Sequence, residues 1–445
     1  MFPDDLEYGL DLLLSSQPKE ALEIVKRLRQ LPAPASDDVR IDLHEAGILW
    51  GMARYREALS VTTTAEVKAR ARDARLILAA ALLRRAEILW KLPAGASYDD
   101  AAPALDEAEG ILRDAGDRIG VAKVKMCRAQ YLINSAATMP QAAALFEEAV
   151  RVFREVGNHL LAHDPLLYLA NLRSWTGDLD RALTLVHEAQ AEIELTGQAS
   201  EAFDFSEQGA LQVQRGNLDA ARDAFAAARV AMKRDGWTLE PLTMPIYEAQ
   251  MLREEDRLDD ARAALERAHL DSVFGFDVRQ RLAGLDCDQG QPEEGLGRSR
   301  SARAQLPAKP RPLQEAVASA IEAGCLLARG DFGEALPVSE RGIAAGDESG
   351  VFKWKVLNGV LKASAQVGLG QTSLARRSLE GLLRDVSAKH FVQLELETAL
   401  TLGEVELKLA RVAGRARLER VERDARARGF LRIARLAHSA LAPVG

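Results

Sequence analysis

The stretch that decides the fold reads GDLDRALTLVHEAQ and runs from Gly177 to Gln190. A close copy, GNLDAARDAFAAA, begins at Gly216. In both copies leucine follows the glycine by two residues and alanine follows it by five. Self-similarity at a fixed distance of about forty residues is typical of repeat architectures. We take the alanine of each copy, Ala182 or Ala221, as the anchor of a repeat.

The anchor recurs along the whole chain at a period near forty residues. It falls at Ala21, Ala58, Ala101, Ala142, Ala182, Ala221, Ala261, Gly295, Ala335, Ala375 and Ala416. In several units a large residue follows four positions later and a small one seven positions later, as Phe225 and Ala228 do. These three positions share one face of an α-helix.

A second small residue lies twelve positions before many anchors, for example Ala170 and Gly209. Small side chains allow two helices to approach closely. A turn glycine lies between the two small residues in many units, and Gly177, Gly216, Gly290, Gly330 and Gly370 occupy this place. Glycine there favours the end of one helix and the start of the next. The sequence therefore predicts an all-α fold, an α-solenoid of about eleven antiparallel helix pairs with a C-terminal capping helix.

The composition agrees with this fold and indicates the cellular compartment. The chain has 445 residues, 47% of them hydrophobic and only 5% aromatic, with a net charge of −8. Abundant alanine and straight-chain residues favour helices. No apolar run of about 18 residues suggests a membrane span, and the acidic N-terminus does not resemble a signal peptide. Three cysteines far apart predict buried thiols, not a disulfide framework. We expect a cytoplasmic protein with no membrane partner.

The repeat resembles the tetratricopeptide family. The resemblance rests on two series, Ala170–Gly177–Leu179–Ala182–Val186–Ala189 and Gly209–Gly216–Leu218–Ala221–Phe225–Ala228. The period is nearer forty than the family's thirty-four, and the family's closing proline is mostly absent. Both features resemble the longer repeats of large bacterial signalling and transcription regulators. The resemblance implies a right-handed superhelix whose first helices line a concave groove.

The strongest interruption of the pattern is ARAQLPAKPRP, at Ala302–Pro312. Three prolines in this stretch predict a break at 303–312. The array would then divide into residues 1–302, with about eight helix pairs, and residues 313–445 with the capping helices. The alternative is one continuous solenoid.

Catalytic motifs are weak, and we expect a protein that is not an enzyme and has no cofactor or metal. His159 and His163 are four residues apart, but Leu160 stands where a zinc protease motif has glutamate. We expect this segment to form a turn between stacked units. The chain from Arg411 onward carries a charge of about +6. A solvated capping helix pair explains this charge better than nucleic-acid binding, and a docking face for a neighbouring domain is the third reading.

The family's groove positions, carried over to this sequence, give a candidate binding surface. Its residues are Trp50, Glu87, Trp90, Tyr131, Asn134, Asn171, Trp175, Gln250 and Arg253. Trp and Tyr with a few polar groups are typical of recognition surfaces. The competing interpretation is that the rings only fill the space between long helices. The predicted function is a non-catalytic scaffold for a protein or peptide partner, and the alternative is a ligand-sensing module of a bacterial transcriptional or kinase regulator.

Overall fold

The structure, a computed structural model, describes residues 18–92, 97–196, 201–234, 243–268, 270, 274–307 and 310–442. Every regular element in these ranges is a helix, and they contain no β-strand. In chain order the helices are α2 (Pro18–Leu28), η1 (Ala35–Asp37), α3 (Val39–Gly51), α4 (Tyr55–Ala71), α5 (Arg75–Lys91), α6 (Tyr98–Asp114), α7 (Arg118–Leu132), α8 (Met139–Glu155), α9 (His159–Thr176), α10 (Leu179–Thr196), α11 (Glu201–Gln214), α12 (Leu218–Arg234), α13 (Met244–Glu254), α14 (Leu258–Glu266), α15 (Gly275–Asp288), α16 (Pro292–Ala304), α17 (Pro312–Arg329), α18 (Phe332–Ser349), α19 (Phe352–Gly368), α20 (Thr372–Ala388), α21 (Val392–Leu409), α22 (Arg411–Ala427) and α23 (Leu431–Leu441).

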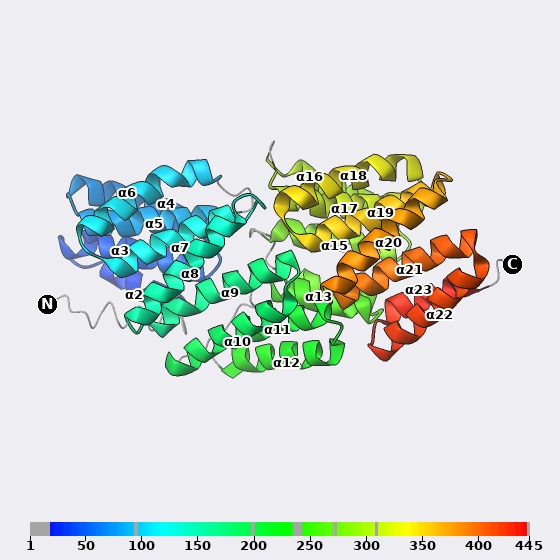
Figure 1. The fold of residues 1–445 in the computed structure, drawn as a ribbon. Helices are drawn as coiled ribbons and strands as arrows, with labels where there is room; N and C mark the ends of the chain where they lie inside the picture. The colour runs from blue at the N-terminus through cyan, green and yellow to red at the C-terminus, as the bar shows by residue number, and fades with distance from the viewer. Residues whose placement is uncertain are drawn as a thin grey trace.

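Successive helices pack against each other as pairs along the chain (Figure 1). Helices α3 to α22 make ten such pairs, and α23 follows them as the cap. Helix α2 is the second helix of the first unit, and the first helix predicted for that unit lies outside the described residues. The fold is a tetratricopeptide-like α-solenoid, which confirms the predicted class and its C-terminal capping helix.

The anchors lie where two helices of a unit meet. Ala182 and Ala221 are fully buried. A side-chain carbon added to Gly209, twelve residues before the second anchor, would lie 2.7 Å from the ring of Phe225. A residue without a side chain is therefore needed at Gly209, because the Phe225 ring of the partner helix occupies the space that a side chain would take.

Turn glycines end the first helices as predicted. Gly177 and Gly216 have φ angles of 87° and 81°, a left-handed conformation that costs other residues free energy. Gly290, Gly330 and Gly370 also have positive φ. Each of these glycines lets the chain reverse between the two helices of its unit.

The register predicted for the last unit is wrong. Ala416 is exposed on α22, whereas Gly414 is buried against the backbone of Leu407. Only Ala410 separates α21 from α22, and a side-chain carbon at Gly414 would overlap the backbone of Leu407. Leu418 and Val421, four and seven residues after Gly414, are buried, so Gly414 is the eleventh anchor.

The packing continues across the predicted break at 303–312. Leu296 of α16 and Leu326 of α17 belong to one hydrophobic cluster. Helices α16 and α17 also contact each other directly. The division into residues 1–302 and 313–445 stays a prediction.

Two cysteines are not the buried thiols that the sequence suggested. Cys287 of α15 and Cys325 of α17 form a disulfide, and their Cα atoms are 5.4 Å apart. They are 38 residues apart in sequence, close to one repeat period, so stacking brings them together. Cys127 is free and buried, as predicted.

The segment around His159 is not a turn, contrary to expectation. Asn158 caps the start of α9 by accepting a hydrogen bond from the backbone N–H of Leu161 at 3.1 Å. Asn is a preferred cap because its side-chain oxygen satisfies an otherwise unpaired amide. His163 consequently lies within the helix, where it is buried.

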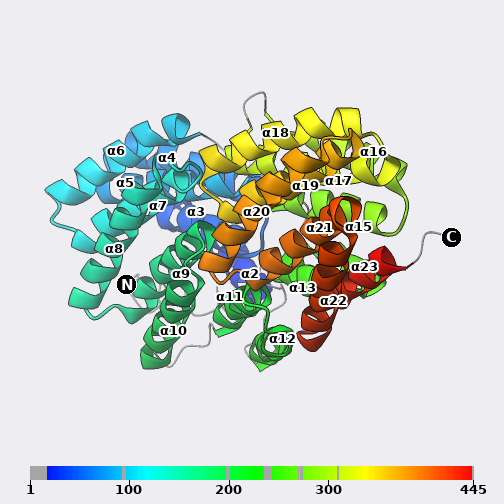
Figure 2. The same cartoon turned by 45° about the vertical axis from the view of Figure 1, so that its right-hand side comes forward.

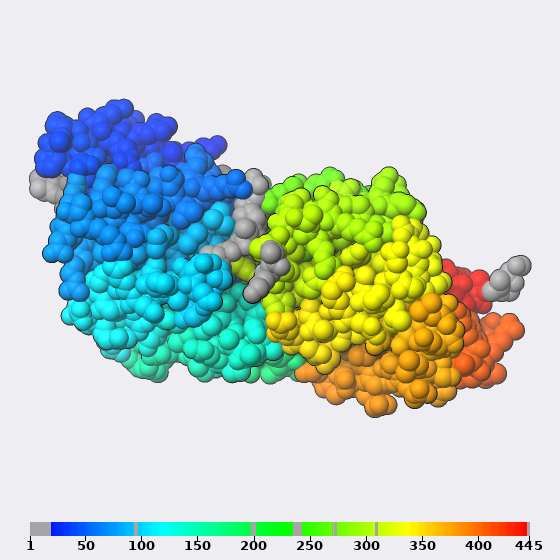
Figure 3. Space-filling view, turned by 90° about the horizontal axis from the view of Figure 1, so that it is seen from above, coloured from blue at the N-terminus to red at the C-terminus, as the bar shows by residue number. Residues whose placement is uncertain are grey.

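Units far apart in the chain also touch, because the superhelix closes on itself. Lys389 Nζ donates to the Thr176 carbonyl at 2.6 Å across 213 residues of sequence. The backbone N–H of Ala136 donates to the Glu348 carbonyl at 2.8 Å. Helix α21 contacts α11, and α23 contacts α13 (Figure 2). In the space-filling view of Figure 3 the blue-to-cyan part and the green-to-orange part lie side by side.

Candidate functional site

The three tryptophans of the predicted groove lie near the C-terminal ends of α3, α5 and α9. Trp90 is buried in the largest hydrophobic cluster, with its ring 6.2 Å from Tyr168, and Trp175 packs at the edge of the same cluster. Trp50 is half-buried in a different cluster, under the guanidinium of Arg84 at 5.7 Å. Trp90 and Trp175 thus belong to one cluster and Trp50 to another, and the role of the three rings in binding stays a prediction.

The polar groove candidates of the N-terminal half make contacts within the chain. Tyr131 is buried and donates to the Ala86 carbonyl at 2.7 Å. Asn134 donates to the Tyr131 carbonyl at 3.1 Å. Glu87 pairs with Arg84 at 2.9 Å, and Asn171 is partly exposed on α9. Their role as a binding surface stays a prediction.

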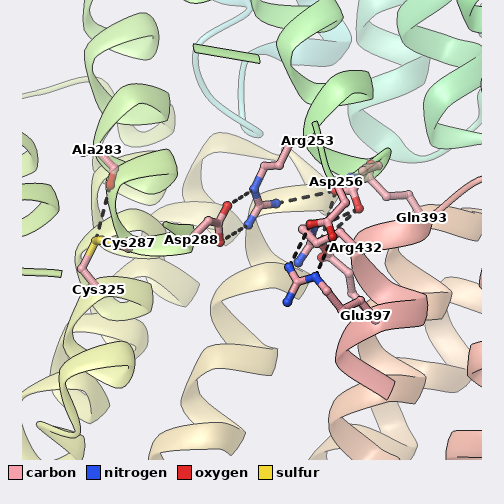
Figure 4. Close-up of polar contacts among 11 residues, drawn as sticks. Arg253, Asp256, Ala283, Cys287, Asp288, Cys325, Gln393, Glu397 and Arg432 are labelled. Atoms are coloured by element: carbon pink, nitrogen blue, oxygen red, sulfur yellow. Dashed lines mark hydrogen bonds and ion pairs between the residues drawn. A yellow bond between two sulfur atoms is a disulfide. The ribbon is translucent and has the colours of Figure 1, made fainter. Parts of the chain in front are cut away.

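Gln250 belongs to a network that joins α13 to α21 and α23, and Figure 4 shows Gln393, Glu397 and Arg432 of this network with Arg253 beside it. Glu254 of α13 accepts from Arg432 at 3.0 Å and from Gln393 at 3.1 Å. Arg432 also donates to Glu397 at 2.6 Å, and Gln250 donates to Gln393 at 2.8 Å. We call Gln250, Glu254, Gln393, Glu397 and Arg432 the clasp.

Arg253 lies beside the clasp and faces another unit. Its guanidinium donates to Asp288 of α15 at 2.5 and 3.1 Å. Burial would raise the pKa of Asp288, but Arg253 outweighs burial and holds the pKa below its usual value. Both groups are therefore charged at neutral pH, and α13 is tied to α15 as well as to α21 and α23.

Two cations next to the clasp form no ion pair with any described residue. They are Arg281 of α15 and Lys353 of α19, and both are partly exposed. The Arg281 Nε is buried without a hydrogen-bond partner among the described residues. Burial, and then the charge of Arg281, lowers the pKa of Lys353 to about 7. Each cation has therefore lost part of its hydration and forms no ion pair with a described residue in return.

The acids that face these cations are already engaged or disfavoured as anions. Glu397 and Glu254 face Lys353, but Arg432 holds both. Burial raises the pKa of Asp277, which faces Arg281. Sequence reasoning missed Arg281 and Lys353, since nothing in the repeat pattern marks a cation whose partner is absent.

A third inner-surface cation lies in the N-terminal half. Lys91 follows Trp90, and its ammonium group is 4.7 Å from the Trp90 ring. Burial lowers the pKa of Lys91 to about 8, against the attraction of Asp164 and Glu87. The first helices of the pairs thus present cations in both halves of the molecule.

Two clefts lie elsewhere, between second helices and their neighbours. The first has a volume of about 380 Å³ and is bounded by α8, α9 and α10; its floor includes Leu166 and Leu169. The second, of about 230 Å³, is bounded by α12, α13 and α14. Arginines of the first cleft pair with glutamates of the same cleft, for example Arg181 with Glu188 at 2.9 Å. Neither cleft includes a residue of the predicted groove.

Within the described ranges, no group of three or more His, Cys, Asp or Glu side chains could hold a metal ion. His159 and His163 each bind a carboxylate instead, Glu192 and Asp204 respectively, both at 2.7 Å. None of the described helices is long and apolar enough to cross a membrane.

Known structures with a similar course of the chain are helical-repeat proteins. Yeast Tom70 matches with 14% sequence identity and a TM-score of 0.41, over 95% of this chain and 92% of that one. The Rap conjugation gene regulator of plasmid pLS20, solved with the Phr* peptide, matches with 17% identity and a TM-score of 0.46, over 78% of this chain and 94% of that one. No family model and no curated protein sequence matches the chain.

Proposed function

We propose that the protein is a non-catalytic scaffold that binds an acidic peptide or protein segment on the inner surface of its superhelix. The observation that supports this proposal is the pair Arg281 and Lys353. A desolvated cation without a partner is costly, and a carboxylate of a bound segment would supply the missing charge. The partly exposed Tyr247, whose pKa is raised by burial and by Glu207, offers an aromatic contact beside them.

A regulatory role is the second candidate, and the clasp favours it. Charged side chains of α13, α21 and α23 close the superhelix where the unpaired cations lie. A segment bound at Lys353 would act on Glu254 and Glu397 and thereby on the clasp. Binding and superhelix closure would then be linked, as a ligand-sensing module of a regulator requires.

The test uses fluorescent peptides of equal length that are acidic, neutral or basic. We expect the acidic peptides to bind tightest, and Lys353→Met to weaken their binding by about tenfold or more, since a desolvated charge pair is lost. The matched control is Lys355→Met on the same helix, because Lys355 is exposed and already pairs with Asp347 at 2.7 Å. Equal binding of all three peptides, or equal loss in both variants, would contradict the proposal.

A further inference from the structure

Asp288 and Arg253 lie between the Cys287–Cys325 disulfide and the clasp (Figure 4). The disulfide joins α15 to α17, the first helices of two successive units. Cys325 is fully buried, whereas Cys287 is partly exposed. A covalent bond therefore fixes one unit on the next at the place where α15 also meets α13.

The sequence makes room for the two sulfur atoms at Gly295. This position is an anchor, and the other buried anchors from Ala21 to Ala375 are alanine. A side-chain carbon at Gly295 would overlap the sulfur of Cys287 and lie 3.1 Å from the sulfur of Cys325. The small anchor and the cysteine pair thus belong together, as parts of one built site.

One residue connects this site to the clasp. Asp288 follows Cys287 directly and is the last residue of α15. It holds Arg253, whose Nη1 is 3.6 Å from the Glu254 carboxylate. Glu254 in turn holds Arg432 of α23. A shift at the end of α15 would reach the clasp through these ion pairs.

We propose that the Cys287–Cys325 disulfide is a redox switch that sets how firmly the clasp closes the superhelix. A low-molecular-weight thiolate attacks the sulfur of Cys287, the more exposed of the two residues, and the Cys325 sulfur leaves and takes a proton. A second thiol then releases Cys287 as a thiol and forms a low-molecular-weight disulfide. The protein gains two electrons and two protons, and the reverse reaction restores the bond.

Reduction changes the packing because two unbonded sulfur atoms need more separation than two bonded ones. Cys325 is surrounded by core, so the end of α15 moves and carries Asp288 with it. The contacts of Arg253 and Glu254 then weaken, and the inner surface opens more readily. The consequence for ligand binding rests on the proposed function, but the effect on the clasp does not.

The test compares hydrogen exchange in the oxidised and the reversibly reduced full-length protein, with alkylation and mass spectrometry to count free thiols. We expect exchange in α13 and α23 to be at least about tenfold faster after reduction, because local opening becomes easier, with α5 unchanged. Cys127→Ser should behave as the wild type. Asp288→Asn should speed exchange in α23 even when the disulfide is intact.

Two results would overturn the switch: thiols that stay free after treatment with an excess of low-molecular-weight disulfide, or equal exchange in both states. Binding of the acidic peptides is measured on the same samples. If hydrogen exchange changes on reduction but no peptide binds to the oxidised or the reduced protein, the proposed function is refuted and the switch stands. Peptide binding without any response of α13 and α23 refutes the switch alone.

Discussion

At the scale of single residues, His163 shows how two neighbouring carboxylates keep a buried histidine charged. It lies on α9 and is 2% exposed. Its ring binds Asp204 of α11 at 2.7 Å and Asp164 at 3.0 Å. Burial would lower the pKa of His163, but the two carboxylates outweigh burial and raise it to about 10. The imidazolium therefore joins two successive units as an ion pair, and no metal is needed to explain the histidine.

We expect this pair to make stability depend on pH in the alkaline range. The pKa of His163 is higher in the folded protein than its ordinary value of 6.5. The stabilisation is therefore fully present below about pH 6.5 and is lost as the pH rises through about 10. His163→Gln should lower the free energy of unfolding at pH 7 by about 3–5 kcal/mol, because the buried Asp204 loses its ion pair with His163.

Urea unfolding of wild type and variant at several pH values between 6 and 10 checks this prediction. The difference between the two proteins should shrink as the pH rises. His187→Gln on α10 is the control, because His187 is exposed. A difference that stays constant with pH would show that the ring stabilises the units by packing alone.

At the scale of helices, the ion pairs between successive units follow the same period as the anchors. Arg70 pairs with Glu107 at 2.6 Å, and the two residues are 37 positions apart. Arg154 and Glu192 are 38 positions apart and pair at 2.6 Å. The Arg70–Glu107 pair lies on the surface and contributes little, whereas Glu192 is buried. The close approach at the anchors decides the spacing of the helices, and the charged pairs follow it.

The last unit offers a direct test of the corrected register. Alanine in place of glycine normally stabilises a helix interior by about 1 kcal/mol. We expect Gly414→Ala to destabilise the protein instead by about 1–3 kcal/mol, because α22 would be pushed away from α21. A Cβ there would lie 2.7 Å from the Glu406 carbonyl carbon.

Thermal and urea unfolding of Gly414→Ala and Ala416→Leu measure the effect. The second variant places a larger side chain at the originally predicted anchor, which is exposed, so we expect a change within about 0.5 kcal/mol. The opposite order of the two variants would restore Ala416 as the anchor.

At the scale of the whole molecule, the superhelix is stabilised by contacts between its own successive turns. The C-terminal arginines take part, since Arg432 pairs with Glu254 and Arg435 pairs with Asp256 at 2.6 Å. Arg432 and Arg435 of α23 thus dock on acids of the same chain, whereas most arginines of α22 are exposed to solvent. The turns at Gly177 and Gly216 also contribute, because Lys389 and Val392 lie directly against them.

A comparison of Gly216 with Gly370 distinguishes the contribution of superhelix closure to stability from that of local backbone strain. Their φ angles are 81° and 79°, so alanine should cost each about 1–2 kcal/mol in backbone strain. A Cβ at Gly216 would also lie 2.5 Å from Val392 Cγ1, whereas nothing lies within 4 Å of one at Gly370. We expect Gly216→Ala to cost a further 1–3 kcal/mol, roughly, through overpacking.

The two variants are compared by urea unfolding and by small-angle scattering. Gly216→Ala should unfold at lower urea and have a larger radius of gyration, and Gly370→Ala should keep the wild-type radius. Identical behaviour would mean that the contact between α21 and the turn at Gly216 does not support the fold.

The sequence by itself determined the helical class, the period, the buried anchors and the turn glycines, because each depends on neighbours within one unit. Ala182, Ala221 and Gly177 carry that information locally. It did not reveal the anchor at Gly414, because Ala416 is also small and also lies about forty residues after Ala375.

Only the tertiary structure decided which distant groups meet. The small rotation between units accumulates along the array, so the partner of Thr176 or Glu254 depends on the geometry of every unit between it and Lys389 or Arg432. The same accumulation places Arg281 beside Lys353. These contacts are what make the inner surface a candidate binding site, and a repeat pattern with a single period does not contain them.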